Sequence, residues 1–130
     1  MDLTQMVATM PFAVAIGVEL ESATADEVRG GMPFDPERCT IGGILHGGAL
    51  MALADSVGAI CAFLNLPEGA STSTIESKTN FFRGVSSGRV HVVSRPLHVG
   101  RRTIVIENDL RDDDGRRVAL VLQTQAVLTP

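Results

Sequence analysis

Residues 41–64 read IGGILHGGALMALADSVGAICAFL, and this stretch decides the fold. It opens with a glycine-rich segment and continues, from Gly47 to Leu64, as the only long helical candidate in the chain. A helix over these 18 residues would be about 27 Å long. Because it is apolar on nearly every face, we expect other parts of the structure to wrap it on most sides.

A membrane span has to be weighed, because the length of this helix suits one. Asp55 lies at its centre, where a carboxylate costs about 3 kcal/mol in a bilayer. No basic residues flank the segment, and amphipathic strands follow it. The sequence therefore predicts a buried helix in a protein that does not contact membranes.

Segments on both sides of this helix have the alternating, β-branched pattern of strands. Before it we predict a short helix at 3–10, which Pro11 ends, and strands at 14–21 and 27–34. After it we predict strands at 73–83, 89–99, 102–110 and 118–128. Because short turns separate the last four, we expect antiparallel neighbours in a meander. The predicted fold class is α+β, a curved antiparallel sheet around one central helix, with its outer face against water or another subunit.

Size and composition restrict the class of protein. A chain of 130 residues and 13.8 kDa predicts a single domain over residues 1–130. A net charge of −4 and the absence of Trp and Tyr argue against nucleic acid as a partner. Three histidines and no zinc-ligand spacing argue against a metal site. Cys39 and Cys61 are predicted to be free thiols, and with no visible targeting signal we expect a cytoplasmic protein.

Charge is distributed unevenly along the chain. Residues 1–77 carry ten acids and two bases, whereas residues 78–130 carry five acids and nine bases. The basic half suits a small polyanion such as a nucleotide cofactor. Solvated strand faces explain the same pattern equally well, so the charge alone leaves both interpretations open.

The start of the long helix carries the first candidate for chemistry. Gly47 and Gly48 allow a sharp turn, and the first N–H groups of a helix have no intrahelical acceptor. Such N–H groups can polarise a carbonyl and stabilise the oxyanion formed from it. Asp55 is the second candidate, because a carboxylate in so apolar a helix is costly unless it is paired or functional.

These two candidates cannot meet within one chain. Asp55 lies eight residues after Gly47, which is about 12 Å along a helix. If two copies pack with antiparallel helices, Gly47 of one copy meets Asp55 of the other. The sequence therefore predicts a two-fold dimer with two shared sites.

The string His46-Gly47-Gly48 followed by Ala52-Leu53-Ala54-Asp55 resembles the hotdog-fold acyl-CoA thioesterases. The resemblance is to the phenylacetate-degradation and 4-hydroxybenzoyl-CoA types in particular. The segments 74–84 and 100–103 resemble the strand after the helix and the next hairpin of that family. The resemblance covers nearly the whole chain. It implies the hotdog fold, a homodimer or a dimer of dimers, an acyl-CoA substrate, and neither a metal nor an organic cofactor.

The resemblance also implies roles for individual residues. Asp55 matches the carboxylate that acts as general base or nucleophile, and Gly47 matches the N–H that polarises the thioester carbonyl. His46 matches a histidine near the thioester, and Thr74 matches a hydroxyl that orients water or the carboxylate. Thr40 stands where many relatives have Asn, so this part of the site departs from the family pattern.

Other residues are candidates for binding the substrate. Arginine side chains match phosphate oxygens, which coenzyme A carries. The candidates for the phosphates are Arg83, Arg89, Arg101 and Arg102. Gly48, Met51, Phe81 and Phe82 are candidates near the acyl group. An acyl-thioester hydratase or dehydratase, and a non-catalytic acyl-CoA-binding module, remain alternatives to a thioesterase.

Overall fold

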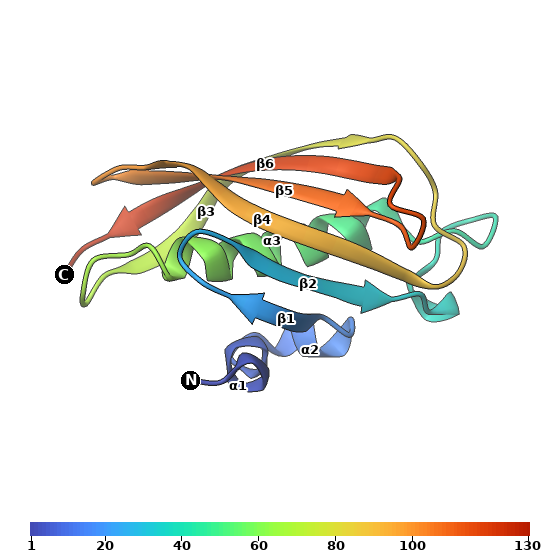
Figure 1. Ribbon diagram of the computed structural model, residues 1–130, viewed down its shortest axis with the longest axis horizontal. Helices are drawn as coiled ribbons and strands as arrows, with labels where there is room; N and C mark the ends of the chain where they lie inside the picture. Colours follow the sequence, from blue (N-terminus) through green and yellow to red (C-terminus); the bar gives the residue numbers. More distant parts are fainter.

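Helix α3 (Gly47–Phe63) lies along the inner face of a curved sheet in the computed structural model, which describes residues 1–130 (Figure 1). The strands are β1 (Glu19–Ala23), β2 (Val28–Pro33), β3 (Ser71–Phe81), β4 (Arg89–Val99), β5 (Thr103–Arg111) and β6 (Arg117–Leu128). Their order in the sheet is β1-β2-β4-β5-β6-β3, and all neighbours are antiparallel. The predicted α+β class, with its sheet around a central helix, is confirmed.

One side of α3 provides most of its burial. Leu50, Leu53, Val57 and Cys61 recur every three or four residues and are almost fully buried. On other faces Met51 and Phe63 remain 38% and 52% exposed. The chain therefore covers α3 mainly on the side of the sheet and leaves parts of its other faces exposed. No helix in the structure is both long and apolar enough to cross a membrane.

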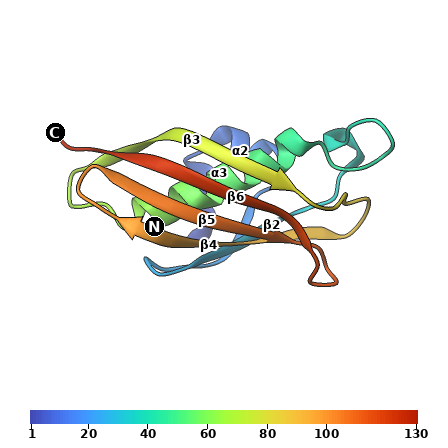
Figure 2. The same cartoon turned by 90° about the horizontal axis from the view of Figure 1, so that it is seen from above.

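The place of β3 differs from the prediction. Strands β4, β5 and β6 form a meander, but β3 pairs with β6 at the edge of the sheet and not with β4 (Figure 2). Residues 82–88 cross one end of the sheet to reach β4 on the other side of β5. A short connection usually joins neighbouring strands, but the seven residues between β3 and β4 are extended enough to pass two strands.

The N-terminal region also differs from the prediction. Helix α1 (Leu3–Ala8) is followed directly by a second helix, α2 (Pro11–Ala15), and the strand expected from residue 14 begins only at Glu19. Pro11 does not simply end a helix, because it occupies the first turn of α2, where its missing N–H costs nothing. Both helices lie beside β1, and a short 3-10 turn, η1 (Pro36–Arg38), follows β2 (Figure 1).

A bulge in β3 controls which of its side chains face α3. The pairing with β6 shifts register between Thr74 and Glu76, so that Ile75 is an extra residue. Thr74 pairs with Gln125 and Ser77 pairs with Gln123, and both glutamines are buried on the inner face. Since directly paired residues share a face, Thr74 and Ser77 both point toward the helix although they are three residues apart.

The two thiols should differ in reactivity. Cys61 is fully buried against β4, where its Sγ donates a hydrogen bond to the Ser94 carbonyl, and burial raises the pKa of its thiol to about 11. Cys39 is only half-buried. At pH 8 we expect a disulfide reagent to modify one thiol per native chain and both thiols in denaturant, because the thiolate is the reactive form. Cys39→Ser should abolish the fast reaction, and two fast thiols in the native protein would contradict this packing of α3.

Candidate active site

His46 caps the start of α3. Its Nδ1 accepts a hydrogen bond of 2.7 Å from the Gly48 N–H, so the neutral ring carries its proton on Nε2. The Gly47 N–H is one residue earlier and has no acceptor in the chain. The cap therefore uses the N–H of Gly48 and leaves that of Gly47 as the free donor.

The carboxylate of Asp55 is held by two donors from the sheet. Its Oδ1 accepts from the Thr74 hydroxyl at 2.8 Å and from the Gln123 amide at 3.0 Å. Neither Ser56 nor any other residue of α3 contributes, because Ser56 donates to the Ala52 carbonyl instead. The hydrogen-bond donors that Asp55 needs are thus supplied by β3 and β6.

Gly47 and Asp55 are not brought together within the chain. They lie two turns apart on α3, and eight residues span about 12 Å. Phe81 lies over Gly47, since a Cβ at position 47 would be 3.0 Å from the tip of its ring. Between Thr74 and Phe81, the inward hydroxyls of Ser77 and Thr79 are buried without a hydrogen-bond partner. This strip of β3 therefore runs alongside the helix from one candidate to the other.

The remaining candidates for substrate binding lie on α3, directly after β3 and in the loop before α3. Met51 and Phe82 are 38% and 59% exposed, and Phe82 directly follows β3. Thr40 is exposed in the loop before α3, where its N–H donates to the Ile44 carbonyl. The structure gives the Thr40 hydroxyl no hydrogen bond, so its role stays a prediction.

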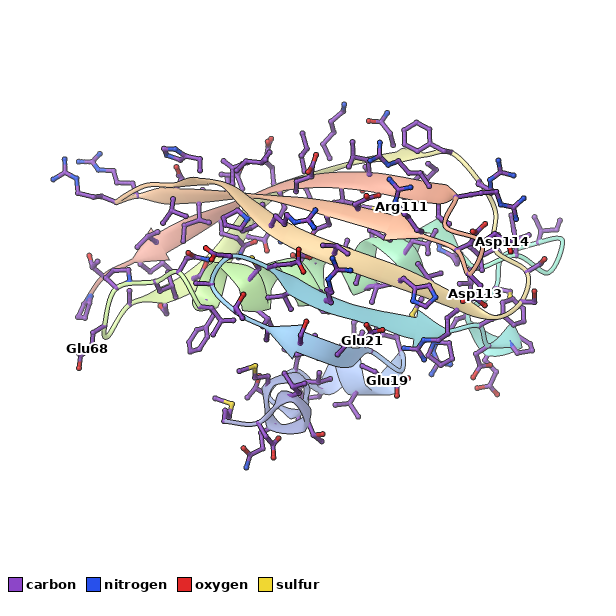
Figure 3. The ribbon with its side chains drawn as sticks, in the orientation of Figure 1. Glu19, Glu21, Glu68, Arg111, Asp113 and Asp114 are labelled. Carbon is purple, nitrogen blue, oxygen red and sulfur yellow. The ribbon has the colours of Figure 1, made fainter.

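Most of the basic residues in the second half of the chain are paired with acids. Five arginines form ion pairs: Arg89 with Glu19, Arg95 with Glu27, Arg111 and Arg117 with Asp109, and Arg116 with Asp112. Asp113 and Asp114, in the turn between β5 and β6, lie near these arginines (Figure 3). A hydrogen bond from His91 lowers the pKa of Asp113. The charge pattern is thus partly explained by strand-face pairing.

Four basic residues form no ion pair, and three of them are phosphate candidates. The unpaired residues are Lys78, Arg83, Arg101 and Arg102. The Arg83 N–H bonds to the carbonyl of Val118 near the start of β6, and the Arg102 carbonyl accepts from Val127 near its end. Nine residues of strand separate them by roughly 30 Å, so Arg83 lies at one end of the sheet and the pair Arg101 and Arg102 at the other.

Buried amides near Asp55 were missed by the sequence analysis. Gln123, Gln125 and Asn108 are at most 1% exposed and lie on the inner face of β5 and β6. The available signal was polar residues at positions where the alternation of these strands requires apolar ones. Gly58 of α3 makes room for them, because a Cβ there would be 2.1 Å from Gln123 Oε1. No group of three or more His, Cys, Asp or Glu side chains is placed to hold a metal ion.

This fold and site define a class of protein. A family model described as the thioesterase superfamily matches residues 42–119, which include the helix and most of the sheet. The chain belongs to this superfamily, and the resemblance seen in its motifs is confirmed.

Individual relatives and solved structures agree. The chain is 32% identical to the thioesterase PA1618 of Pseudomonas aeruginosa, and the crystal structure of a variant of that protein superposes with a TM-score of 0.92 over 98% of this chain and 94% of the other. It is 33% identical to the proofreading thioesterase EntH of Cronobacter turicensis, over 87% of this chain and 82% of that protein. It is 31% identical to the 1,4-dihydroxy-2-naphthoyl-CoA hydrolase of Escherichia coli, over 87% and 83%.

The close approach at Gly58 generates a prediction about stability. Ala in place of Gly inside a helix normally stabilises by up to about 1 kcal/mol. Gly58→Ala should instead lower the free energy of unfolding by about 1–3 kcal/mol, because the new Cβ collides with Gln123 and Asn108. Urea unfolding of both proteins measures this difference, and a variant as stable as the parent would contradict the packing of α3 on the amides.

Proposed function

We propose that the protein hydrolyses acyl-CoA thioesters to a free acid and coenzyme A. The observation that carries the proposal is the anchored carboxylate of Asp55, with the free N–H of Gly47 at the other end of the same helix segment. The similarity to the proofreading thioesterase EntH and to the 1,4-dihydroxy-2-naphthoyl-CoA hydrolase supports the same reaction here. His46 and Thr74 complete the proposed catalytic set.

The chemistry needs no cofactor. The Gly47 N–H polarises the thioester carbonyl and stabilises the oxyanion that forms when a nucleophile adds to the carbon. With Asp55 as general base, water loses a proton to the carboxylate, adds to the carbon, and the C–S bond breaks as the proton passes to the leaving thiolate. With Asp55 as nucleophile, its carboxylate oxygen adds to the thioester carbon, the C–S bond breaks and the CoA thiolate leaves, which gives a mixed anhydride. Water then adds to the Asp55 carbon of the anhydride, and the bond from that carbon to the acyl carboxylate breaks to release the free acid. Incorporation of solvent oxygen-18 into Asp55 in a single turnover distinguishes the two routes.

The site requires a second copy of the chain. Edge strand β3 has only β6 as a neighbour, and Ile75, Phe81 and Phe82 on and beside it are more than half exposed. A two-fold dimer with antiparallel α3 helices along this edge brings Gly47 and His46 of one subunit to Asp55 and Thr74 of the other. The same symmetry sets Arg101 and Arg102 of one subunit at the end of the dimer where Arg83 of the other lies, available to the phosphates of coenzyme A.

Thiol release from a panel of aromatic and aliphatic acyl-CoA esters tests the reaction. We expect Asp55→Asn and Asp55→Ala to lower kcat at least ~100-fold with little change in KM, because the lost group acts in the chemical step. Thr74→Ser, which keeps the hydroxyl, is the matched control and should stay active. Enoyl-CoA absorbance changes without thiol release would indicate hydration instead, and tight binding without turnover would indicate a binding module.

The shared site is tested by complementation between two inactive variants. Gly47→Pro removes the N–H at a helix position that tolerates proline, after a residue already extended at ψ 135°. Gly47→Ala is the control, because it keeps the N–H and places the same Cβ against the Phe81 ring. We expect a sedimentation mass of at least a dimer and a kcat at least ~100-fold lower in Gly47→Pro. Co-refolded Gly47→Pro and Asp55→Asn should recover about a quarter of the wild-type rate, since half the dimers are mixed and carry one intact site. No recovery, or a monomer, would refute the shared site.

A further inference from the structure

A row of three buried polar side chains crosses the sheet beneath α3 and ends at Asp55. Ser94 on β4, Asn108 on β5 and Gln123 on β6 are 0–1% exposed. We call them the amide row. Ser94 Oγ donates to Asn108 Oδ1 at 2.5 Å, Asn108 Nδ2 donates to Gln123 Oε1 at 2.6 Å, and Gln123 Nε2 donates to Asp55 Oδ1 at 3.0 Å. Buried polar groups of this kind stabilise only when every member is paired.

The row has a single direction. Each amide accepts on its oxygen and donates from its nitrogen toward the carboxylate, and the second hydrogens are also used. Asn108 Nδ2 reaches the Val121 carbonyl at 3.3 Å, and Gln123 Nε2 reaches Gln125 Oε1 at 2.9 Å. Turning Gln123 over would bring its oxygen against Asp55 Oδ1 and Gln125 Oε1, and its nitrogen against Asn108 Nδ2. Turning Asn108 over would bring its oxygen against Gln123 Oε1 and the Val121 carbonyl. The structure therefore fixes an N–H donor, and not an acceptor, at Asp55.

Thr74 by itself does not guarantee Asp55 a hydrogen-bond donor. Its hydroxyl carries one hydrogen but has two acceptors within reach, Asp55 Oδ1 at 2.8 Å and Gln125 Oε1 at 2.6 Å. When that hydrogen goes to Gln125, Gln123 is the remaining donor from the chain to the carboxylate. Gly58 permits the arrangement, because any side chain there would displace Gln123 and Asn108.

We propose that Gln123, oriented by Asn108 and Ser94, is a positioning residue that fixes Oδ1 of Asp55 and leaves Oδ2 free to meet the water or the thioester carbon. The inference rests on the proposed hydrolysis and adds residues to it. It assigns the buried row a role in the chemical step, beyond filling the space between helix and sheet. A row with only a packing role would make no difference to a folded enzyme's kcat.

The first test is Gln123→Met, which keeps the volume and removes the donor. We expect kcat to fall about 10-fold while KM changes by less than about two-fold, because the carboxylate is mispositioned in the chemical step. Ile106→Ala is the control, since Ile106 is the fully buried partner of Gln123 on β5 and, being apolar, donates no hydrogen bond to Asp55. It should lower the unfolding temperature and leave kcat unchanged.

A second variant tests the orienting role of Asn108. Asn108→Leu is close in volume and should lower kcat several-fold in the parent but not in the Gln123→Met background, because it acts through Gln123. Should Gln123→Met fail to fold, Gln123→Asn keeps an amide that is one methylene too short to reach Asp55 and gives the same comparison. A folded Gln123 variant with the parent kcat would overturn the proposal.

The outcome can be separated from that of the proposed function. If the parent hydrolyses thioesters and Asp55→Asn does not, but the Gln123 variants retain full kcat, only the positioning role fails. If the parent hydrolyses no thioester, the proposed function fails, and the side-chain amide signals of Gln123 in nuclear magnetic resonance spectra still report on the row. Those signals should exchange slowly with solvent and shift in Asp55→Asn, and unshifted signals would overturn the assigned contact.

Discussion

The fold depends on the hydrogen bonds that stabilise the carboxylate of Asp55 in the otherwise apolar helix α3. A half-buried carboxylate is costly to leave unpaired, and α3 itself offers Asp55 no donor. The sheet supplies the donors from β3 and β6, so the helix must lie in one register over these strands. Gly58, one turn further along, brings the helix close enough for that pairing. The same contacts therefore set the position of α3 on the sheet and provide the hydrogen bonds of Asp55.

These contacts also explain why the two groups of the proposed site on α3 do not touch within one chain. The Gly47 N–H is free because it belongs to the first turn, and Asp55 is held because it lies deeper, beside the sheet. A rigid helix keeps these groups at a constant separation. In the proposed dimer, two antiparallel helices would convert that separation into two identical pairs of Gly47 and Asp55.

The sequence predicted those parts of the fold that depend on local pattern. The long helix, the bounds of β4 and the α+β class followed from periodicity, and Asp55 was identified because a charge stands out in an apolar helix. The pairing of β3 with β6 was missed because it is decided by which strand covers the helix, and no local signal encodes that. The donor Gln123 was missed for a related reason: a single polar residue in a strand gives no indication of which side chain it will meet across the core.

The extra residue at Ile75 has an effect on the composition of the inner face. Strand residues alternate, so without it the side chains turned toward the helix after Thr74 would be Glu76, Lys78 and Asn80. Glu76 would then lie next to Asp55, and Lys78 would lie between Asp55 and the end of β3 at Phe81. One inserted residue thus turns Glu76 and Lys78 to the outer face of β3 and keeps the hydroxyls of Ser77 and Thr79 on the inner face. Asp55 is then the only charged side chain along this inner face of β3.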